Sequence, residues 1–244
     1  MKKVELHLSK TRLKDEELIS KLQGFLMASI SPDFATFLHE QETNPYSMNL
    51  SSTRDESVWV VNLLSEEAEQ QMLAPLLNLE TIKLESYAEE ILVKKVEIHS
   101  LSQKALLDIY QDDDASHLIR VHFYTPTTFK RQGQFVLFPG TRLIFQSLMQ
   151  KYSRLVEGRV EIEEETLQFL ADHSQITSYH LKSHYFPIHG RKYPAFEGRV
   201  TIQVKGASTL KAYAQMLLRF GEYAGVGTKC SLGMGGMRIE ERKD

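Results

Sequence analysis

The spacing of apolar residues predicts strands and helices in a recurring order, beginning with those of residues 1–112. Residues 4–8 alternate between apolar and polar side chains, which is typical of a strand with one buried face. Residues 15–30 place apolar side chains at helical spacing, and acidic residues near their start favour a helix. The Ser-Pro-Asp break at 31–33 ends this helix and begins a short second one through His39.

The remainder of this half continues with the same mixture of elements. Strands are predicted at 46–52, 57–64, 81–87 and 93–99, and helices at 66–77 and 102–110. The order is close to strand-helix-strand-strand-helix-strand with a trailing helix. That order is typical of a split βαβ, or ferredoxin-like, domain.

A polar run at 111–114 separates this half from a second one of similar plan. Strands are predicted at 118–124, 134–138, 174–184, 196–205 and 237–240, and helices at 140–155, 163–173 and 210–220. We therefore expect an α+β protein with two tandem ferredoxin-like (RRM-like, βαββαβ) domains, at residues 1–112 and 113–244. The predicted duplication is architectural, because no fixed-period sequence repeat accompanies it.

Composition indicates a globular chain without a membrane segment. Of its 244 residues, 42% are hydrophobic and 25% are charged. No apolar run approaches the roughly 20 residues that a membrane-spanning helix needs. The charged N-terminus lacks the apolar core of a signal peptide, and the single cysteine, Cys230, has no internal disulfide partner. A cytoplasmic location is expected.

The net charge of −3 conceals an asymmetry between the halves. Residues 1–112 contain 11 Lys and Arg against 19 Asp and Glu, a net charge of −8. Residues 113–244 contain 18 against 13, a net charge of +5. A polyanion is therefore expected to bind the second half. Uneven drift of surface charge is the alternative explanation.

A glycine-rich segment at 221–236 follows the last strongly predicted helix. Six of its sixteen residues are glycine, and Lys229 adds a positive charge. Glycine permits positive φ and close backbone approach, and successive N–H groups in such a loop can bind an anion. A helix leads into the segment rather than out of it, so the pattern is neither a Walker loop nor a dinucleotide fingerprint. The segment is expected to lie along a phosphodiester backbone or against a neighbouring domain; a helix cap followed by two tight turns is the alternative.

The spacing of these glycines resembles a family signature. Gly225-Val226-Gly227, then Lys229, then Gly233-Met234-Gly235 is similar to the C-terminal motif of the repeat-associated RNA-binding superfamily. Within it, the chain resembles the type III-associated CRISPR endoribonucleases that trim precursor CRISPR RNA. The resemblance implies two tandem ferredoxin-like domains, in agreement with the element order. It also implies CRISPR repeat RNA as the partner, a transient association with a type III effector complex, no membrane, and a monomer or homodimer.

A second segment resembles the same family. Residues 37–40 (Phe-Leu-His-Glu), followed by 44–48 (Asn-Pro-Tyr-Ser-Met), are similar to its histidine segment, and by that resemblance His39 is catalytic. Metal-independent RNA cleavage requires the 2′-hydroxyl to lose a proton, the phosphorane to be stabilised and the 5′-oxygen to gain a proton. Imidazole, with an ordinary pKa of about 6.5, can act as acid or base. The products would be a 2′,3′-cyclic phosphate, or the 3′-phosphate, and a 5′-hydroxyl. A surface histidine at a helix end is the alternative.

The groups that assist His39 follow from weaker patterns. Family members often place a tyrosine or basic residue on the first helix, where this chain has Gly24 and Phe25. Lys21 is the nearby candidate for stabilising the phosphorane, with a solvated lysine as the alternative. No Cys/His cluster has metal-ligand spacing, so neither a metal nor another cofactor is expected.

RNA-binding residues are predicted in the glycine-rich segment and in two basic clusters. Lys182 and His184 alternate along a predicted strand and therefore share one face. A polar turn contains the other cluster, and solvated surface is the alternative for both. The predicted RNA-binding residues are Gly225, Gly227, Lys229, Ser231, Gly233, Gly235, Lys182, His184, Lys130 and Arg131.

Two other functions remain open at this point. A non-catalytic RNA-binding subunit of a CRISPR effector complex would use the same fold and the same glycine-rich segment. A protein-interaction or small-ligand module built on duplicated ferredoxin-like domains would bind no nucleic acid. Salt-dependent binding to RNA would exclude the last of these.

Overall fold

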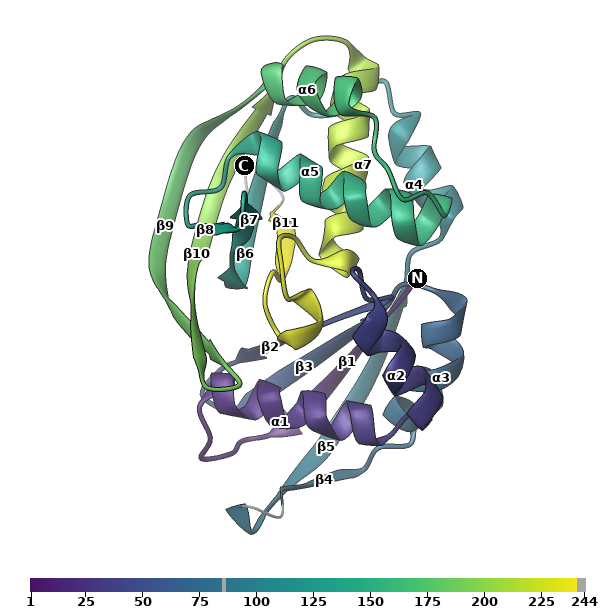
Figure 1. Cartoon of the computed structure of the whole chain (residues 1–244), viewed down its shortest axis with the longest axis vertical. Helices are drawn as coiled ribbons and strands as arrows, with labels where there is room; N and C mark the ends of the chain where they lie inside the picture. Colours follow the sequence, from purple (N-terminus) through teal and green to yellow (C-terminus); the bar gives the residue numbers. More distant parts are fainter. Residues whose placement is uncertain (85–86, 241–244) are drawn as a thin grey trace.

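The computed structural model describes residues 1–84 and 87–240, and Figure 1 shows two α/β units in tandem. The first unit contains β1 (Lys2–Ser9), α1 (Asp15–Ala28), α2 (Pro32–Glu40), β2 (Tyr46–Ser52), β3 (Glu56–Leu63), α3 (Glu66–Leu77), β4 (Thr81–Leu84) and β5 (Glu89–Ser100). Its sheet has the order β2-β3-β1-β5-β4, and every neighbouring pair is antiparallel. With β5 as the fourth strand, this is the ferredoxin-like order. Residues 85 and 86 of the strand predicted at 81–87 lie outside the described residues.

The second unit repeats the plan after α4 (Gln103–Tyr110). It contains β6 (Leu118–Thr127), β7 (Phe129–Arg131), β8 (Gln134–Val136), α5 (Thr141–Tyr152), a π-helical turn (Ser153–Glu157), α6 (Glu164–Asp172), β9 (Ser174–Ile188), β10 (Arg191–Val204), α7 (Ser208–Ala224), a 3₁₀ turn (Cys230–Leu232) and β11 (Met237–Glu240). The sheet order β11-β6-β10-β9 matches that of the first unit. The strand predicted at 134–138 is shorter, and it pairs with β7 in a separate hairpin.

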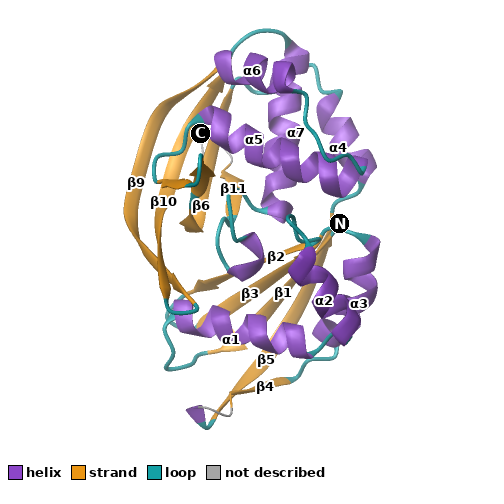
Figure 2. Ribbon diagram, in the orientation of Figure 1, coloured by secondary structure: helices purple, strands orange, loops and turns teal. Residues whose placement is uncertain are grey.

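Strand alternation explains why the helices of each unit cover one face of its sheet, as Figure 2 shows. In β1, Val4, Leu6 and Leu8 are buried in the first core, while the residues between them face the other side. In β10, Val200, Ile202 and Val204 do the same in the second core. The opposite faces keep polar and charged side chains, and that of the first sheet is covered only in part, where β2 and β3 meet the end of α7. Among the described residues, no helix has both the length and the apolar character required to cross a membrane.

Each core contains residues from the other side of the predicted boundary at 112/113. Leu106 of α4 lies in the core of the second unit. Conversely, Phe186 and Ile188, at the end of β9, lie in the core of the first unit together with Ile19 of α1. The end of the long β9–β10 hairpin therefore packs into the core of the first unit. Each unit thus contributes buried residues to the core of the other.

The start of β10 differs from the prediction by five residues. The strand is predicted to begin at 196, yet the structure begins it at Arg191, so that Pro194 lies within it. At Pro194 the strand pairs only with β9, because pairing with β6 starts at Phe196. Proline is tolerated where one side of a strand has no partner, since no ladder hydrogen bond is lost there.

Candidate functional site

His39 occupies the last turn of α2 and is exposed to solvent. The helix begins where the Ser31 side chain accepts a hydrogen bond from the Phe34 N–H (3.3 Å), with Pro32 at its first position. Leu38 on the inner face is buried in the first core. Because successive helical residues point about 100° apart, the neighbouring histidine turns outward. The structure thus presents the imidazole on a rigid helix end.

The segment that follows His39 is bound to the second unit. Asn44 Nδ2 donates a hydrogen bond to Ser231 Oγ (3.1 Å) in the glycine-rich segment. On its other side, Arg154 pairs with Glu42 (2.6 Å) and donates to Thr43 Oγ1 (3.3 Å). Arg154 lies in the π-helical turn after α5. The histidine segment and the glycine-rich segment are therefore brought together.

A cavity of about 250 Å³ lies between these two segments. Its walls are residues 42–46, the side of α5 and residues 227–231. Lys151 and Lys229 contribute positive charge to its lining. A second cavity, of about 340 Å³, is lined by Arg154 and Arg159 together with residues 40–43, which follow His39 and include Glu40 and Glu42. Arg154 is already paired with Glu42, so the positive charge between the end of α2 and the glycine-rich segment comes from Arg159, Lys151 and Lys229. These three residues form a basic path that suits a polyanion.

The glycines pack the segment against the protein rather than opening it to solvent. Gly225, Gly233 and Gly235 are buried and have positive φ. A Cβ on Gly227 would lie 2.3 Å from the Thr128 carbonyl oxygen, and one on Gly233 would lie 2.6 Å from the Ile19 side chain. The segment thus lies against the first unit, one of the two placements expected from the sequence, since Ile19 belongs to α1.

The expected cradle of free N–H groups is wrong for three of these glycines. The N–H of Gly225 donates to the Gly221 carbonyl (2.9 Å), that of Gly227 to Ser147 Oγ (2.8 Å), and that of Gly235 to the Pro126 carbonyl (2.9 Å). These donors are therefore occupied within the protein. The half-buried residues 227–229 and 231–232 form the part of the segment that is open to a ligand.

Two lysines position this segment and its charge. Lys229 has a left-handed backbone (φ 62), and its ammonium lies 4.6 Å from the centre of the Tyr193 ring. Lys151 Nζ donates to the carbonyls of Ala224 (3.3 Å) and Gly225 (2.9 Å), and lies 2.9 Å from Cys230 Sγ. No sequence pattern indicated Lys151, because the spacing of polar residues on a helix does not specify which distant loop they contact.

The structure brings Gln23, not Lys21, to the glycine-rich segment. Burial raises the pKa of the Tyr46 phenol to about 12, while interactions with the Gln23 and Ser231 side chains act in the opposite direction. Lys21 is exposed, and its ammonium lies 5.4 Å from the centre of the Tyr87 ring. Residues two apart on a helix point in different directions, so Lys21 stays a prediction that these contacts do not support.

The two predicted basic clusters have different surroundings. Lys130 and Arg131 are exposed at the end of β7, next to a tight turn in which Gln132 and Gly133 have positive φ. Thr128, just before β7, accepts a hydrogen bond from the Thr228 N–H (3.0 Å). This hairpin therefore adjoins the glycine-rich segment.

Lys182 and His184 share a face of β9, as predicted, but acidic residues surround them. His184 Nε2 lies 3.7 Å from Glu197 Oε1, and Lys182 is the register partner of Glu197. A cavity of about 260 Å³ here is also lined by Asp15 and Glu16 of α1. Burial, the largest effect, raises the pKa of Glu197. This charge pattern is less favourable to phosphate than that around Lys151 and Lys229.

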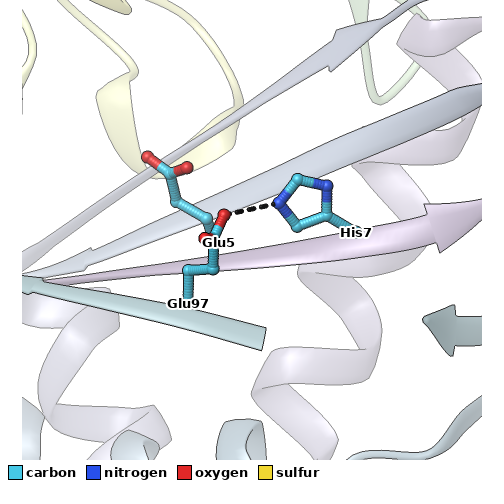
Figure 3. A group of neighbouring side chains, drawn as sticks. All are labelled: Glu5, His7 and Glu97. Carbon is cyan, nitrogen blue, oxygen red and sulfur yellow. Dashed lines mark hydrogen bonds and ion pairs between the residues drawn. The ribbon is translucent and has the colours of Figure 1, made fainter. Parts of the chain in front are cut away.

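A further cluster lies on the uncovered face of the first sheet (Figure 3). Glu5, His7 and Glu97 place potential metal ligands within 4.8 Å of one another. His7 Nε2 lies 3.0 Å from Glu97 Oε2, and Lys95 forms a 2.7 Å ion pair with the same carboxylate. Hydrogen bonding to Lys95, followed by that to His7, lowers the pKa of Glu97. Lys95 therefore already balances this carboxylate. Spacing along the chain could not reveal the cluster, because β5 is distant from β1 in the sequence.

Comparison with known proteins gives matches over the whole chain. The family model described as CRISPR-associated endoribonuclease Cas6 matches residues 121–237. The chain is 46% identical over 244 residues, covering 100% of both chains, to a CRISPR-associated endoribonuclease Cas6 of Streptococcus thermophilus. It is 34% identical over 227 residues to one of Mycobacterium tuberculosis, covering 90% of this chain and 70% of the relative.

Solved structures agree in fold. A Cas6 product complex superposes with a TM-score of 0.80 at 22% identity, covering 99% of this chain and 100% of the other. A Cas6 substrate mimic complex gives 0.74 at 24% identity, covering 98% of each chain. A Thermus thermophilus Cas6 gives 0.71 at 19% identity, again covering 98% of each. The tandem ferredoxin-like expectation agrees with these neighbours and with the two strand orders.

Proposed function

The chain belongs to the Cas6 family of CRISPR-associated endoribonucleases, and we propose that it cuts CRISPR precursor RNA within the repeat without a metal ion. His39 is the proposed catalytic residue. The observation that carries this assignment is the position of His39 next to a segment that Asn44 and Arg154 bind to the basic second unit. A phosphodiester held there would have an imidazole on one side and the glycine-rich segment on the other.

The proposed reaction replaces the bond between phosphorus and the 5′-oxygen with a bond between phosphorus and the 2′-oxygen. The 2′-hydroxyl oxygen attacks the adjacent phosphorus while the bond from phosphorus to the 5′-oxygen breaks. The 2′-hydroxyl proton is lost, and the 5′-oxygen gains one, so the products are a 2′,3′-cyclic phosphate and a 5′-hydroxyl. Imidazole can perform either transfer near neutral pH. His39 is proposed for one of them, and the 3′-phosphate would arise if water later opens the cyclic ester.

Charge stabilisation is proposed to come from the basic path rather than from Lys21. Negative charge on the phosphorane is stabilised by fixed cations that need no reorganisation. Lys151 is held in place by two carbonyl oxygens, and Lys229 lies at the open part of the segment. Arg159 extends the path towards His39, while Arg154 is already paired with Glu42. These residues support binding of RNA along the boundary between the two units.

The relatives support this proposal. One structural neighbour was solved with product, with a substrate mimic and as a histidine-to-alanine mutant.

Among the described residues, His39 itself has no hydrogen-bond partner that would fix its ring. A catalyst that relies on positioning with little assistance is expected to turn over slowly.

The test is cleavage of a synthetic repeat RNA in EDTA. Wild type should cut once per repeat and leave a cyclic phosphate, and a single 2′-deoxy nucleotide at the cut should block the reaction. His39→Ala should lower the single-turnover rate by about 100-fold or more while retaining RNA binding. His117→Ala provides the matched control, because it also removes an exposed histidine.

Three results would contradict the proposal in different ways. Cleavage that needs Mg²⁺ would exclude the metal-independent reaction. Glu5, His7 and Glu97 would then be candidate ligands of the metal ion. Undiminished cleavage by His39→Ala would exclude this residue as the catalyst. Tight RNA binding without cleavage at any pH would instead identify a non-catalytic RNA-binding subunit.

A further inference from the structure

An aromatic surface extends from the glycine-rich segment onto the β7–β8 hairpin. The Lys229 ammonium lies 4.6 Å from the centre of the Tyr193 ring. Phe135 of β8 packs on Tyr193, with the ring centres 5.5 Å apart and the ring planes at 87°. Figure 1 shows the short hairpin lying alongside β10 near the glycine-rich segment. Two aromatic rings therefore continue the basic path beyond Lys229.

The geometry of the hairpin forces Phe135 outward. Phe129, in the paired strand, is buried in the second core and lies opposite Val136. Strand neighbours alternate between faces, so Phe135 must point away from that core. Its register partner is Lys130, and directly paired residues share a face. Phe135 is 38% exposed even with Tyr193 packed against it.

We infer that Phe135, Tyr193, Lys130 and Lys229 form a stacking platform for an unpaired RNA base beside the cleavage site. This inference rests on the proposed function, because it assumes that RNA lies along the basic path. Phe135 provides the exposed ring, and Tyr193, which is half-buried, supports it. An exposed ring flanked by cations suits single-stranded RNA: the ring stacks on a base and the lysines contact adjacent phosphates. A duplex keeps its bases stacked inside, so the platform selects nucleotides that are unpaired.

Binding of matched variants tests the platform. The probe is repeat RNA with a 2′-deoxy nucleotide at the mapped cut, or unmodified RNA if wild type does not cut. Phe135→Leu keeps an apolar side chain but removes the ring, and should raise the Kd about tenfold. Phe135→Trp should bind within about threefold of wild type, because it restores a stacking surface. Phe169→Leu is the control, since Phe169 is 54% exposed on α6 and packs on His173.

A double-mutant cycle that combines Phe135→Leu with an abasic nucleotide in the RNA tests whether the contact is base stacking. An abasic nucleotide at the contacted position should weaken wild type about as much as Phe135→Leu does, and should have little further effect on that variant. On a blunt RNA duplex the leucine variant should bind like wild type. Equal weakening on duplex and unpaired RNA would overturn the inference, and so would a Kd for Phe135→Leu within about twofold of wild type.

These outcomes are separable from those of the cleavage test. If wild type binds RNA but does not cut it, the proposed function fails while the binding comparison still decides on the platform. If wild type cuts and Phe135→Leu binds normally, only the platform fails. Thermal unfolding of each variant checks that folding is unchanged, as expected for substitutions at exposed positions.

Discussion

Single residues in the glycine-rich segment are constrained by their neighbours in the fold. Gly235 has φ +74, and a Cβ there would lie 2.2 Å from the Val226 carbonyl oxygen. The Val226 carbonyl oxygen belongs to the backbone, so it cannot move aside as the end of a flexible side chain can. By contrast, Gly24 lies within α1, and a Cβ there would meet nothing within 4 Å. The same residue type is thus required at one position and replaceable at the other.

Substituting alanine at these two glycines should change stability in opposite directions. Gly235→Ala should lower the free energy of unfolding by about 2 kcal/mol or more, through a strained φ and a backbone clash. Gly24→Ala should raise it by about 0.5–1 kcal/mol, because alanine is the better helix former. Urea unfolding of both variants measures this. If both substitutions stabilised the protein, the packing described for the segment would be incorrect.

At the scale of elements, the second sheet carries two carboxyl groups in different environments, Glu197 on β10 and Glu240 on β11. Near the first unit, Glu197 lies beside His184 and close to Asp15 and Glu16, and burial raises its pKa. Farther along the same sheet, hydrogen bonding to Arg199 lowers the pKa of Glu240. The two carboxyl groups should therefore affect folding with opposite dependence on pH.

The sign of each effect follows from linkage. A raised pKa means that ionised Glu197 disfavours the fold; its protonated form contributes stability below the ordinary pKa of 4.5, and this is lost as pH rises through the raised value. Glu197→Gln should therefore raise the unfolding midpoint at neutral pH, and the gain should vanish below about pH 4.5.

Glu240→Gln is the matched variant with the opposite expectation. The lowered pKa of Glu240 means that its ionised form stabilises the fold at neutral pH, and this contribution is lost as pH falls through the lowered value. The substitution should lower the midpoint at neutral pH and have little effect in acid. Urea midpoints across a pH series measure both variants, and the same sign for both at neutral pH would contradict the assignment.

At the scale of the whole molecule, buried polar contacts join the two units. Ser47 of β2 donates a hydrogen bond to the Tyr223 carbonyl (2.6 Å) and accepts one from Asn62 Nδ2 (2.9 Å). Tyr223 is in the last turn of α7, where helical carbonyls lack partners within the helix. A serine of the first unit thus completes a helix end of the second, just before the glycine-rich segment. Tyr124 OH also donates across the boundary, to Asn49 Oδ1 (3.1 Å).

Ser47→Ala should destabilise the protein and loosen the boundary between units. It leaves the Tyr223 carbonyl and an Asn62 N–H buried without this partner, which costs about 1–3 kcal/mol. Ser51→Ala, at an exposed position of the same strand, should be within about 0.5 kcal/mol of wild type. Urea unfolding measures the loss, and hydrogen exchange at the end of α7 should increase in Ser47→Ala alone. Equal stability of the two variants would show that this contact does not join the units.

Local patterns were sufficient for most of the secondary structure. Period-two alternation identified β1 at 4–8, and helical spacing with the Ser31 cap identified α1 and α2, because these signals depend on near neighbours. They failed where pairing decided the outcome. The strand at 134–138 joined β7 instead of the sheet, and β10 began five residues early because β9 was available as a partner.

For the site, the sequence by itself determined the candidates, and the tertiary structure decided their arrangement. The motifs around His39 and residues 225–235 are short and contiguous, so they are visible along the chain. That Lys151 holds the glycine-rich segment, that Gln23 rather than Lys21 approaches it, and that Phe135 meets Tyr193 are contacts between distant residues. Such contacts depend on how packed elements orient each side chain in three dimensions, and periodicity along one dimension does not contain that information.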